Sequence, residues 1–202
     1  MARKNIIKSN EFVYHVRNRT IDGTFYPPNE MASIWNLTCD LLRICTWAFG
    51  ARVHSFVLMS NHYHLLLSTT EENIDKCIQY FQSELSRRLS MRNEMQALRF
   101  ATRYKWSVVA DPLYFQKVYR YVYQNPLRAG LVNEVEAYPW STLSGRLGNT
   151  LHQIPVYEFE PFKEFLPKCF EEEVPWLNEI ISDNQLAAIQ KGLKKSIFKM
   201  KG

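Results

Sequence analysis

The chain has 202 residues, of which 46% are hydrophobic and 14% aromatic, enough for one sizeable core and at most a small appendage. Its formal net charge of +5 suits a polyanionic partner, although a basic composition alone only shifts the odds towards nucleic acid. No stretch approaches the ~20 uninterrupted apolar residues of a membrane span, and the start MARKNIIKSNEF lacks the apolar region of a signal peptide. We therefore expect a globular, cytoplasmic protein without a membrane partner.

The cysteines do not predict a metal site. Cys39, Cys45, Cys77 and Cys169 form no CxxC pair and follow no zinc-ribbon or redox spacing. We expect them to be buried or inert thiols.

Hydrophobic patterns divide the first two thirds of the chain into seven elements. Asn29 is the expected N-cap and Gly50 the stop of the first helix, while Asp111 followed by Pro112 is a typical opening for the third. We expect the third helix to end at Pro126, because proline disfavours the helical conformation in the residue before it. The predicted elements are a strand at 11–18, a helix at 29–49, strands at 51–59 and 62–68, a helix at 71–92, a strand at 103–110 and a helix at 111–125.

This order, β-α-β-β-α-β-α, predicts an α+β protein: a ferredoxin-like sheet with packed helices and a further helix after the last strand. After YPWST at 138–142 the chain becomes rich in proline and charge. We therefore expect one domain over residues 1–148 and a helical C-terminal extension over 149–202. Ser182 and Gln185 form a capping-box pattern that opens a last helix of about residues 183–199.

Two histidines one residue apart stand on the second strand of the predicted hairpin. Side chains alternate along a strand, so His62 and His64 share one face and Tyr63 points to the other. Two imidazoles on one face can bind one ion, yet a pair of hydrogen-bonded sheet histidines is the commoner explanation of an isolated HxH. A functional metal also needs a third ligand.

The third predicted helix, LYFQKVYRYVYQNP at 113–126, can supply that ligand. At ~100° per residue, one narrow sector of this helix contains Tyr114, Val118, Tyr121 and Asn125, and it must face the sheet. Tyr121 and Asn125 are four residues apart, so a phenol and a carboxamide lie one turn from each other. Tyr114 is ~16 Å from Asn125 along the axis, too far to serve the same ion. An ordinary amphipathic helix with tyrosines at the edge of a core explains this pattern about as well.

In combination, these parts resemble the REP-associated tyrosine transposases, a family of HUH single-tyrosine nucleases. The resemblance covers about residues 10–145 in order and spacing. One departure is MQALRFATRYK at 95–105, where the family often has a Gly-containing segment ending in Phe-Gln, so we expect loop contacts to DNA to differ. The matching segments are YHVRNR (14–19), VHSFVLMSNHYHLLL (53–67), RYK (103–105), YVYQNPLRAGLV (121–132) and YPWST (138–142).

The resemblance implies a metal-dependent endonuclease and strand transferase that acts on single-stranded, hairpin-type DNA, as a monomer or a homodimer. His62, His64 and Asn125 match the family's ligands for a divalent ion, Mg²⁺ or Mn²⁺. Tyr121 matches its nucleophile, which forms a 5'-phosphotyrosine intermediate. Several basic side chains could contact phosphates, although a solvated surface residue is the better explanation for each one taken alone. They are Arg17, Arg19, Arg87, Arg88, Arg103, Lys105 and Arg128.

Exposed aromatic side chains such as Trp106 or Tyr123 could stack on bases. The main alternative is a DNA- or RNA-binding module of the same fold without cleavage activity, and the presence of all four expected site residues argues against it. A zinc hydrolase or deaminase built on His62 and His64 is a weaker alternative. The chain lacks the Glu after the first histidine and the PCxxC ligands that such a site needs.

Overall fold

A four-stranded antiparallel sheet forms the centre of the protein, with the strand order β2-β3-β1-β4. The computed structural model describes residues 5–91, 100, 103–150 and 153–198. The predicted end of the second helix at residue 92 and most of the segment 95–105 lie outside these residues. The expected α+β, ferredoxin-like arrangement is confirmed. The strands are β1 (Val13–Arg19), β2 (Ala51–Leu58), β3 (His62–Thr69) and β4 (Lys105–Val109).

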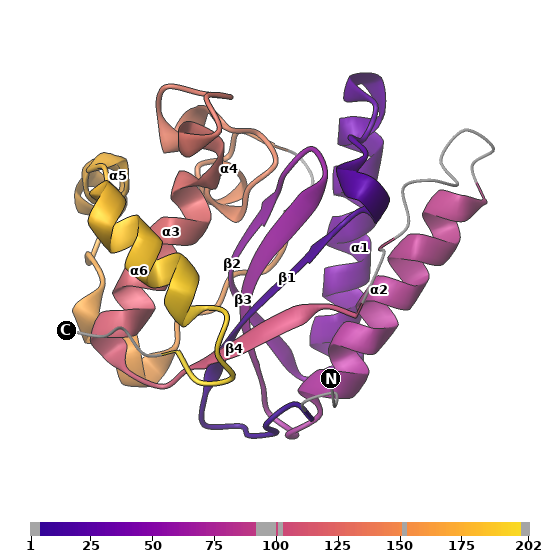
Figure 1. Ribbon diagram of the computed structural model, residues 1–202, viewed down its shortest axis with the longest axis horizontal. Helices are drawn as coiled ribbons and strands as arrows, with labels where there is room; N and C mark the ends of the chain where they lie inside the picture. The colour runs from indigo at the N-terminus through magenta and orange to yellow at the C-terminus, as the bar shows by residue number, and fades with distance from the viewer. Residues whose placement is uncertain (1–4, 92–99, 101–102, 151–152, 199–202) are drawn as a thin grey trace.

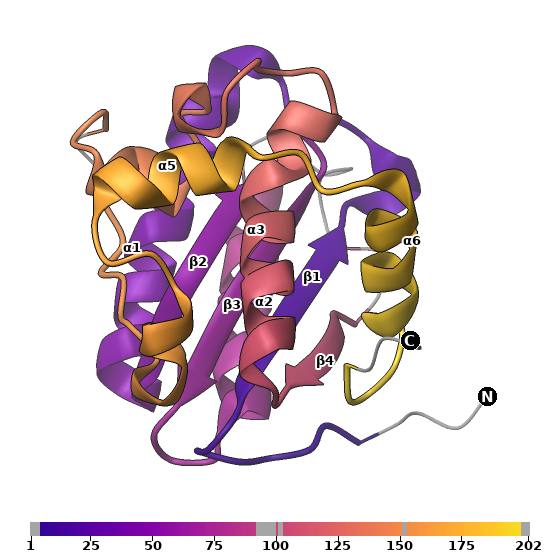
Figure 2. The same cartoon turned by 90° about the vertical axis from the view of Figure 1, so that its left-hand side faces the viewer.

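Helices cover both faces of the sheet (Figure 1). One face packs on α1 and α2 through strand residues such as Leu65 and Leu67, while Leu66 between them belongs to the core beneath α3. This alternation places His64 on the α3 side. Figure 2 shows α3 crossing that face, with α6 beside it near β1 and β4. The helices are α1 (Met31–Phe49), α2 (Ile74–Ser90), α3 (Pro112–Arg128), α4 (Thr142–Arg146), α5 (Phe170–Asn178) and α6 (Asp183–Gly192).

The sequence predicted some helix ends correctly and others incorrectly. Gly50 ends α1 in the left-handed conformation, at φ 60°, and the Asp111 side chain accepts a hydrogen bond of 3.0 Å from the backbone N–H of Tyr114, both as expected. The prediction of Asn29 as an N-cap was wrong. Residues 28–30 form a 3-10 turn that leads directly into α1 at Met31.

The prediction that α3 stops at Pro126 was also wrong, because the helix continues to Arg128. Proline has no N–H, so the carbonyl of Val122 loses its usual helical donor. The side-chain amide of Asn125 donates to that carbonyl at 3.4 Å and to the carbonyl of Tyr121 at 2.6 Å. These contacts compensate for the missing bond, and they hold the Asn125 side chain against its own helix.

The C-terminal residues pack on α3 and on the edge of the sheet. Ser182 caps α6 by accepting from the Gln185 N–H at 3.4 Å, as predicted. The helix ends at Gly192, however, and not near residue 199. Residues 196–198 run beside β4: the Val108 N–H donates to the Ser196 carbonyl and the Phe198 N–H to the Val108 carbonyl, both at 2.8 Å. The open edge of β4 provides backbone partners that the sequence pattern does not reveal.

The cysteines and the apolar character of the helices were also predicted from the sequence. Cys39, Cys45 and Cys77 are buried and Cys169 is exposed, and all four are free thiols. Within the ranges that the structure describes, no helix combines the length and the apolar character needed to cross a membrane.

Candidate active site

The sheet face beneath α3 carries a row of basic and imidazole side chains. Arg17 on β1 lies directly opposite His64 on β3 and Lys105 on β4, and Arg19 lies opposite His62. Residues paired across strands point to the same face. The alternation of side chains along β1, β3 and β4 therefore places two histidines, two arginines and a lysine at one end of the sheet.

Each predicted histidine ligand has a hydrogen-bond partner at its Nδ1 atom. His64 Nδ1 lies 3.0 Å from Nε2 of His15, and the two rings stack with centroids 5.2 Å apart. His62 Nδ1 lies 2.7 Å from Oδ1 of Asn61 and donates to it, because the amide oxygen can only accept. When Nδ1 is the donor in both rings, each Nε2 keeps its lone pair for an electrophile such as a metal ion.

Helix α3 brings Tyr121 and Asn125 to these histidines. The ring centroid of Tyr121 lies 5.3 Å from that of His64 and 6.1 Å from that of His15. A hydrogen bond between the side chains of Tyr121 and Asn125 favours the ionised phenol. Tyr114 packs instead against Phe198, with ring centroids 5.1 Å apart. The helical sector therefore faces the sheet as predicted, and Tyr114 lies away from the histidines.

The histidines, Tyr121 and Asn125 line one cavity of about 340 Å³. None of the described residues around it is acidic, so the cavity has a positive potential that suits a phosphate. Its lining residues are Arg17, Asn18, Arg19, His62, His64, Lys105, Tyr121, Asn125 and Gln190.

Burial determines the protonation states in this cavity. It lowers the pKa of His62 to about 4, assisted by the charges of Arg19 and Arg17, and it lowers the pKa of His64 well below 6.5. Both imidazoles are therefore neutral at pH 7, as metal ligands must be. Burial also raises the pKa of the Tyr121 phenol, while the charge of Arg17 and the hydrogen bond from Asn125 oppose that shift. The Tyr121 phenol is therefore protonated at neutral pH.

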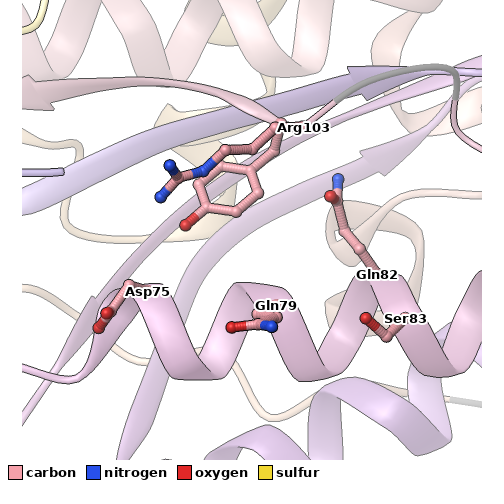
Figure 3. A pocket seen from close by; sticks show the side chains of 6 residues that line it. Asp75, Gln79, Gln82, Ser83 and Arg103 are labelled. Carbon is pink, nitrogen blue, oxygen red and sulfur yellow. The ribbon is translucent and has the colours of Figure 1, made fainter. Parts of the chain in front are cut away.

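Four of the predicted phosphate-binding residues lie away from this cavity. Arg87 and Arg88 are on α2, on the other side of the sheet, where both contact Glu84. Arg103 lines a separate cavity of about 370 Å³ with polar residues of α2 (Figure 3). Arg128 contacts Asp183 and the carbonyl of Ile181, so it ties α3 to the start of α6. Arg17, Arg19 and Lys105 are the three that line the cavity.

The expectation that Tyr123 is an exposed stacking residue was wrong. The Tyr123 ring is buried, and its hydroxyl lies 2.8 Å from that of Thr142. The C-terminal residues cover the face of α3 that a single amphipathic helix would expose to solvent. Trp106 is half-buried and is therefore still accessible in part.

Sequence reasoning missed His15, Asn61 and Gln190. His15 alternates with Arg17 and Arg19 along β1, and this period of two is the signal that could have placed it beside the HxH pair. Asn61 immediately precedes His62 in the hairpin turn. Gln190 reaches the cavity from α6, and nothing in the local sequence predicts that long-range approach.

The residues at this site fit a divalent ion held jointly with a phosphate. They offer two neutral imidazole nitrogens and a carboxamide oxygen, a set that leaves coordination positions open. Across the described ranges, no group of three or more His, Cys, Asp and Glu side chains is placed to hold a metal. Because the expected ligand set is neutral, the phosphate would have to supply the negative charge.

Comparisons with known proteins give a family match over part of the chain and a match of fold. Residues 36–125 match the family model described as Transposase IS200 like. This match supports the predicted resemblance to transposases over 90 of the 202 residues. The IS200-like segment contains His62, His64, Tyr121 and Asn125, whereas His15 and the C-terminal extension lie outside it.

One solved structure shares the fold of this chain. The structure of a REP-associated tyrosine transposase bound to a REP hairpin superposes with a TM-score of 0.61 at 12% identity, covering 81% of this chain and 98% of that one. A candidate transposase from Deinococcus radiodurans R1 has a TM-score of 0.41 at 19% identity, covering 60% of this chain and 94% of that one. No curated protein sequence matches the chain.

Proposed function

We propose that this IS200-like chain cleaves and rejoins single-stranded DNA of the hairpin type, with Tyr121 as the nucleophile. The observation that carries the proposal is the position of the Tyr121 ring, 5.3 Å from that of His64, in a basic cavity that both histidines and Asn125 also line. The family match supports the activity class. The solved relative was bound to a REP hairpin, which supports the kind of DNA.

The chemistry is a transesterification at phosphorus. The Tyr121 phenol oxygen forms a bond to the 5' phosphate, and the bond from phosphorus to the 3' oxygen of the preceding nucleotide breaks. The phenol loses one proton and the 3' oxygen gains one, so the step is balanced without an external reactant. Because the phosphotyrosine ester keeps the energy of the broken linkage, a second DNA 3' hydroxyl can reverse the step and join new ends.

The chain's own residues would bind and orient the phosphate. Arg17, Arg19 and Lys105 provide positive charge to the phosphate oxygens. His62, His64 and Asn125 would hold Mg²⁺ or Mn²⁺, which when bound polarises the phosphate for attack. Arg17 has a second role, because its charge lowers the cost of ionising the Tyr121 phenol.

The deciding experiment is incubation of the protein with end-labelled hairpin DNA and Mn²⁺, followed by gel electrophoresis in SDS. We expect a covalent protein–DNA adduct with the wild type and none with Tyr121→Phe. Tyr114→Phe is the matched control, since this tyrosine lies on the same helix but packs on Phe198. No adduct with the wild type, or an undiminished one with Tyr121→Phe, would sink the proposal.

A second variant separates chemistry from DNA binding. We expect His62→Ala to abolish the adduct while leaving hairpin binding measurable by gel shift, because the basic residues of the cavity remain. Loss of binding together with cleavage would mean that His62 supports the structure of the site and not the reaction. A cleavage-inactive wild type that binds hairpin DNA would favour the alternative of a binding module.

A further inference from the structure

A second hollow of about 300 Å³ lies beside β4, next to the cavity that contains Tyr121. Arg17 and Lys105 line both spaces, so the two are neighbours. We call the second hollow the β4 groove. The residues that line the β4 groove are Arg17, Tyr104, Lys105, Trp106, Leu193, Lys194 and Ser196.

The outer wall of the β4 groove comes from the segment that follows α6. Backbone hydrogen bonds of 2.8 Å from the Val108 N–H to the Ser196 carbonyl and from the Phe198 N–H to the Val108 carbonyl fix this segment on the sheet edge. The buried Phe198 ring anchors it against Tyr114. In Figure 2 this segment emerges below α6, alongside β4. The wall is therefore part of the folded structure.

The β4 groove combines positive charge with an aromatic surface. Arg17 and Lys105 provide cations on the strand side, and the exposed Lys194 provides one on the opposite wall. Among the described residues, no carboxylate forms an ion pair with any of these three, and none of the lining residues is acidic. Trp106 also lines the β4 groove and is partly accessible, while part of its side chain packs on the core beneath α1 and α2. Cations that follow a groove beside an aromatic side chain are the usual means of binding a single nucleic-acid strand.

We propose that the β4 groove binds the unpaired nucleotides on one side of the phosphate that Tyr121 attacks. Lys194 neutralises a phosphate of this flanking strand, and Trp106 stacks on one of its bases. That the bound strand leads to the phosphate attacked by Tyr121 rests on the proposed function. The binding of a single strand in the β4 groove does not. Because stacking on Trp106 needs an unpaired base, the β4 groove selects a single-stranded flank. Its outer wall lies outside the IS200-like segment, which ends at Asn125.

The test is equilibrium binding of fluorescein-labelled oligothymidylate, measured by fluorescence anisotropy at several salt concentrations without divalent ions. All proteins carry Tyr121→Phe, so no covalent product forms. We expect Lys194→Gln to weaken binding several-fold and to reduce the slope of log K against log salt by about 0.7, the value for one phosphate contact on a single strand. Lys168→Gln makes the same charge change at an exposed position that lines neither cavity, and it should match the parent protein.

Trp106→Leu tests the stacking contact. We expect it to weaken binding while leaving the salt slope unchanged, since leucine keeps apolar bulk but offers no aromatic face. Thermal unfolding followed by circular dichroism checks that the variant is folded, because Trp106 also packs on the core.

The proposal is overturned if Lys194→Gln binds with the affinity and salt slope of Lys168→Gln, or if the parent protein does not bind the oligonucleotide. The outcomes separate from those of the proposed function. If oligonucleotide binding depends on Lys194 but the wild-type protein forms no covalent adduct, the β4 groove binds DNA and the cleavage proposal is wrong. If the adduct forms but oligonucleotide binding does not depend on Lys194, the cleavage proposal stands and the β4 groove proposal is wrong.

Discussion

At the scale of single residues, the site depends on side chains that orient other side chains. His64 is buried and has His15 at its Nδ1 atom, while His62 has Asn61. A histidine that is fixed by a hydrogen bond at one nitrogen holds the other nitrogen in a fixed direction, which raises its affinity for a metal ion. In the proposed reaction His15 would therefore act as a positioning residue. It is separated from His64 by 49 positions in the sequence but lies diagonal to it on the next strand.

We predict that His15→Phe raises the Mn²⁺ concentration needed for half-maximal adduct formation by about 10-fold or more. Phenylalanine keeps an aromatic ring beside His64 but cannot hydrogen-bond to its Nδ1 atom. His15→Gln restores an acceptor and should recover part of the Mn²⁺ dependence. The measurement is adduct yield against Mn²⁺ concentration, with hairpin binding as the control. A Phe variant with the wild-type Mn²⁺ curve would contradict the positioning role.

At the scale of elements, hydrophobic period and turn residues placed the strands and most helices correctly because those signals are local. Gly50 marked the end of α1, and the hairpin register put His62 and His64 on one face. The end of α3 was not predictable in this way. Proline's effect on the helix was offset by a side-chain contact from Asn125 to the Val122 carbonyl, which a propensity rule does not include.

The two left-handed glycines that follow α1 and α3 allow a test of what ends these helices. Gly50 has φ 60° and Gly130 has φ 68°. A Cβ on Gly50 would lie 2.1 Å from the Thr70 hydroxyl oxygen, whereas a Cβ on Gly130 would meet nothing within 4 Å. We predict that Gly130→Ala lowers the free energy of unfolding by about 1–2 kcal/mol through backbone strain alone. Gly50→Ala should cost about 1 kcal/mol more because Thr70 must also move.

Urea denaturation of the two variants measures this difference. Equal losses for Gly50→Ala and Gly130→Ala would mean that Thr70 rotates away without cost, so that backbone strain is the whole effect.

At the scale of the whole molecule, the C-terminal extension and the sheet share one core. Phe159, Leu177 and Phe198 from the extension belong to the same cluster as Val118 of α3 and Leu66 of β3. The sequence could predict that the four expected site residues lie together, because His62 and His64 alternate on one strand while Tyr121 and Asn125 are one turn apart on one helix. Gln190 and Lys194 could not be predicted, since they reach the site region only through the packing of α6 and the pairing of residues 196–198 with β4.

His54 links the sheet to the extension and makes the stability of the whole molecule depend on pH. Its Nδ1 donates to the Tyr157 carbonyl at 2.7 Å, and its Nε2 lies 3.0 Å from the Ser68 hydroxyl. Burial lowers the pKa of His54 from 6.5 to about 4. The folded protein therefore favours neutral His54 more strongly than the unfolded chain does. The resulting stability is complete above pH 6.5 and is lost as the pH falls from there towards 4.

For His54 alone, this linkage amounts to about 2 kcal/mol of lost unfolding free energy by a pH of about 5. We predict that His54→Gln, which cannot take up a proton, lowers stability at neutral pH but flattens its decline between about pH 7 and 5 by that amount. The measurement is the urea unfolding free energy at several pH values for the wild type and the variant. A variant with the same decline as the wild type would show that His54 does not couple protonation to unfolding. The steep part would then belong to the other histidines of the sheet: burial lowers the pKa of His15 to about 3, that of His62 to about 4 and that of His64 well below 6.5.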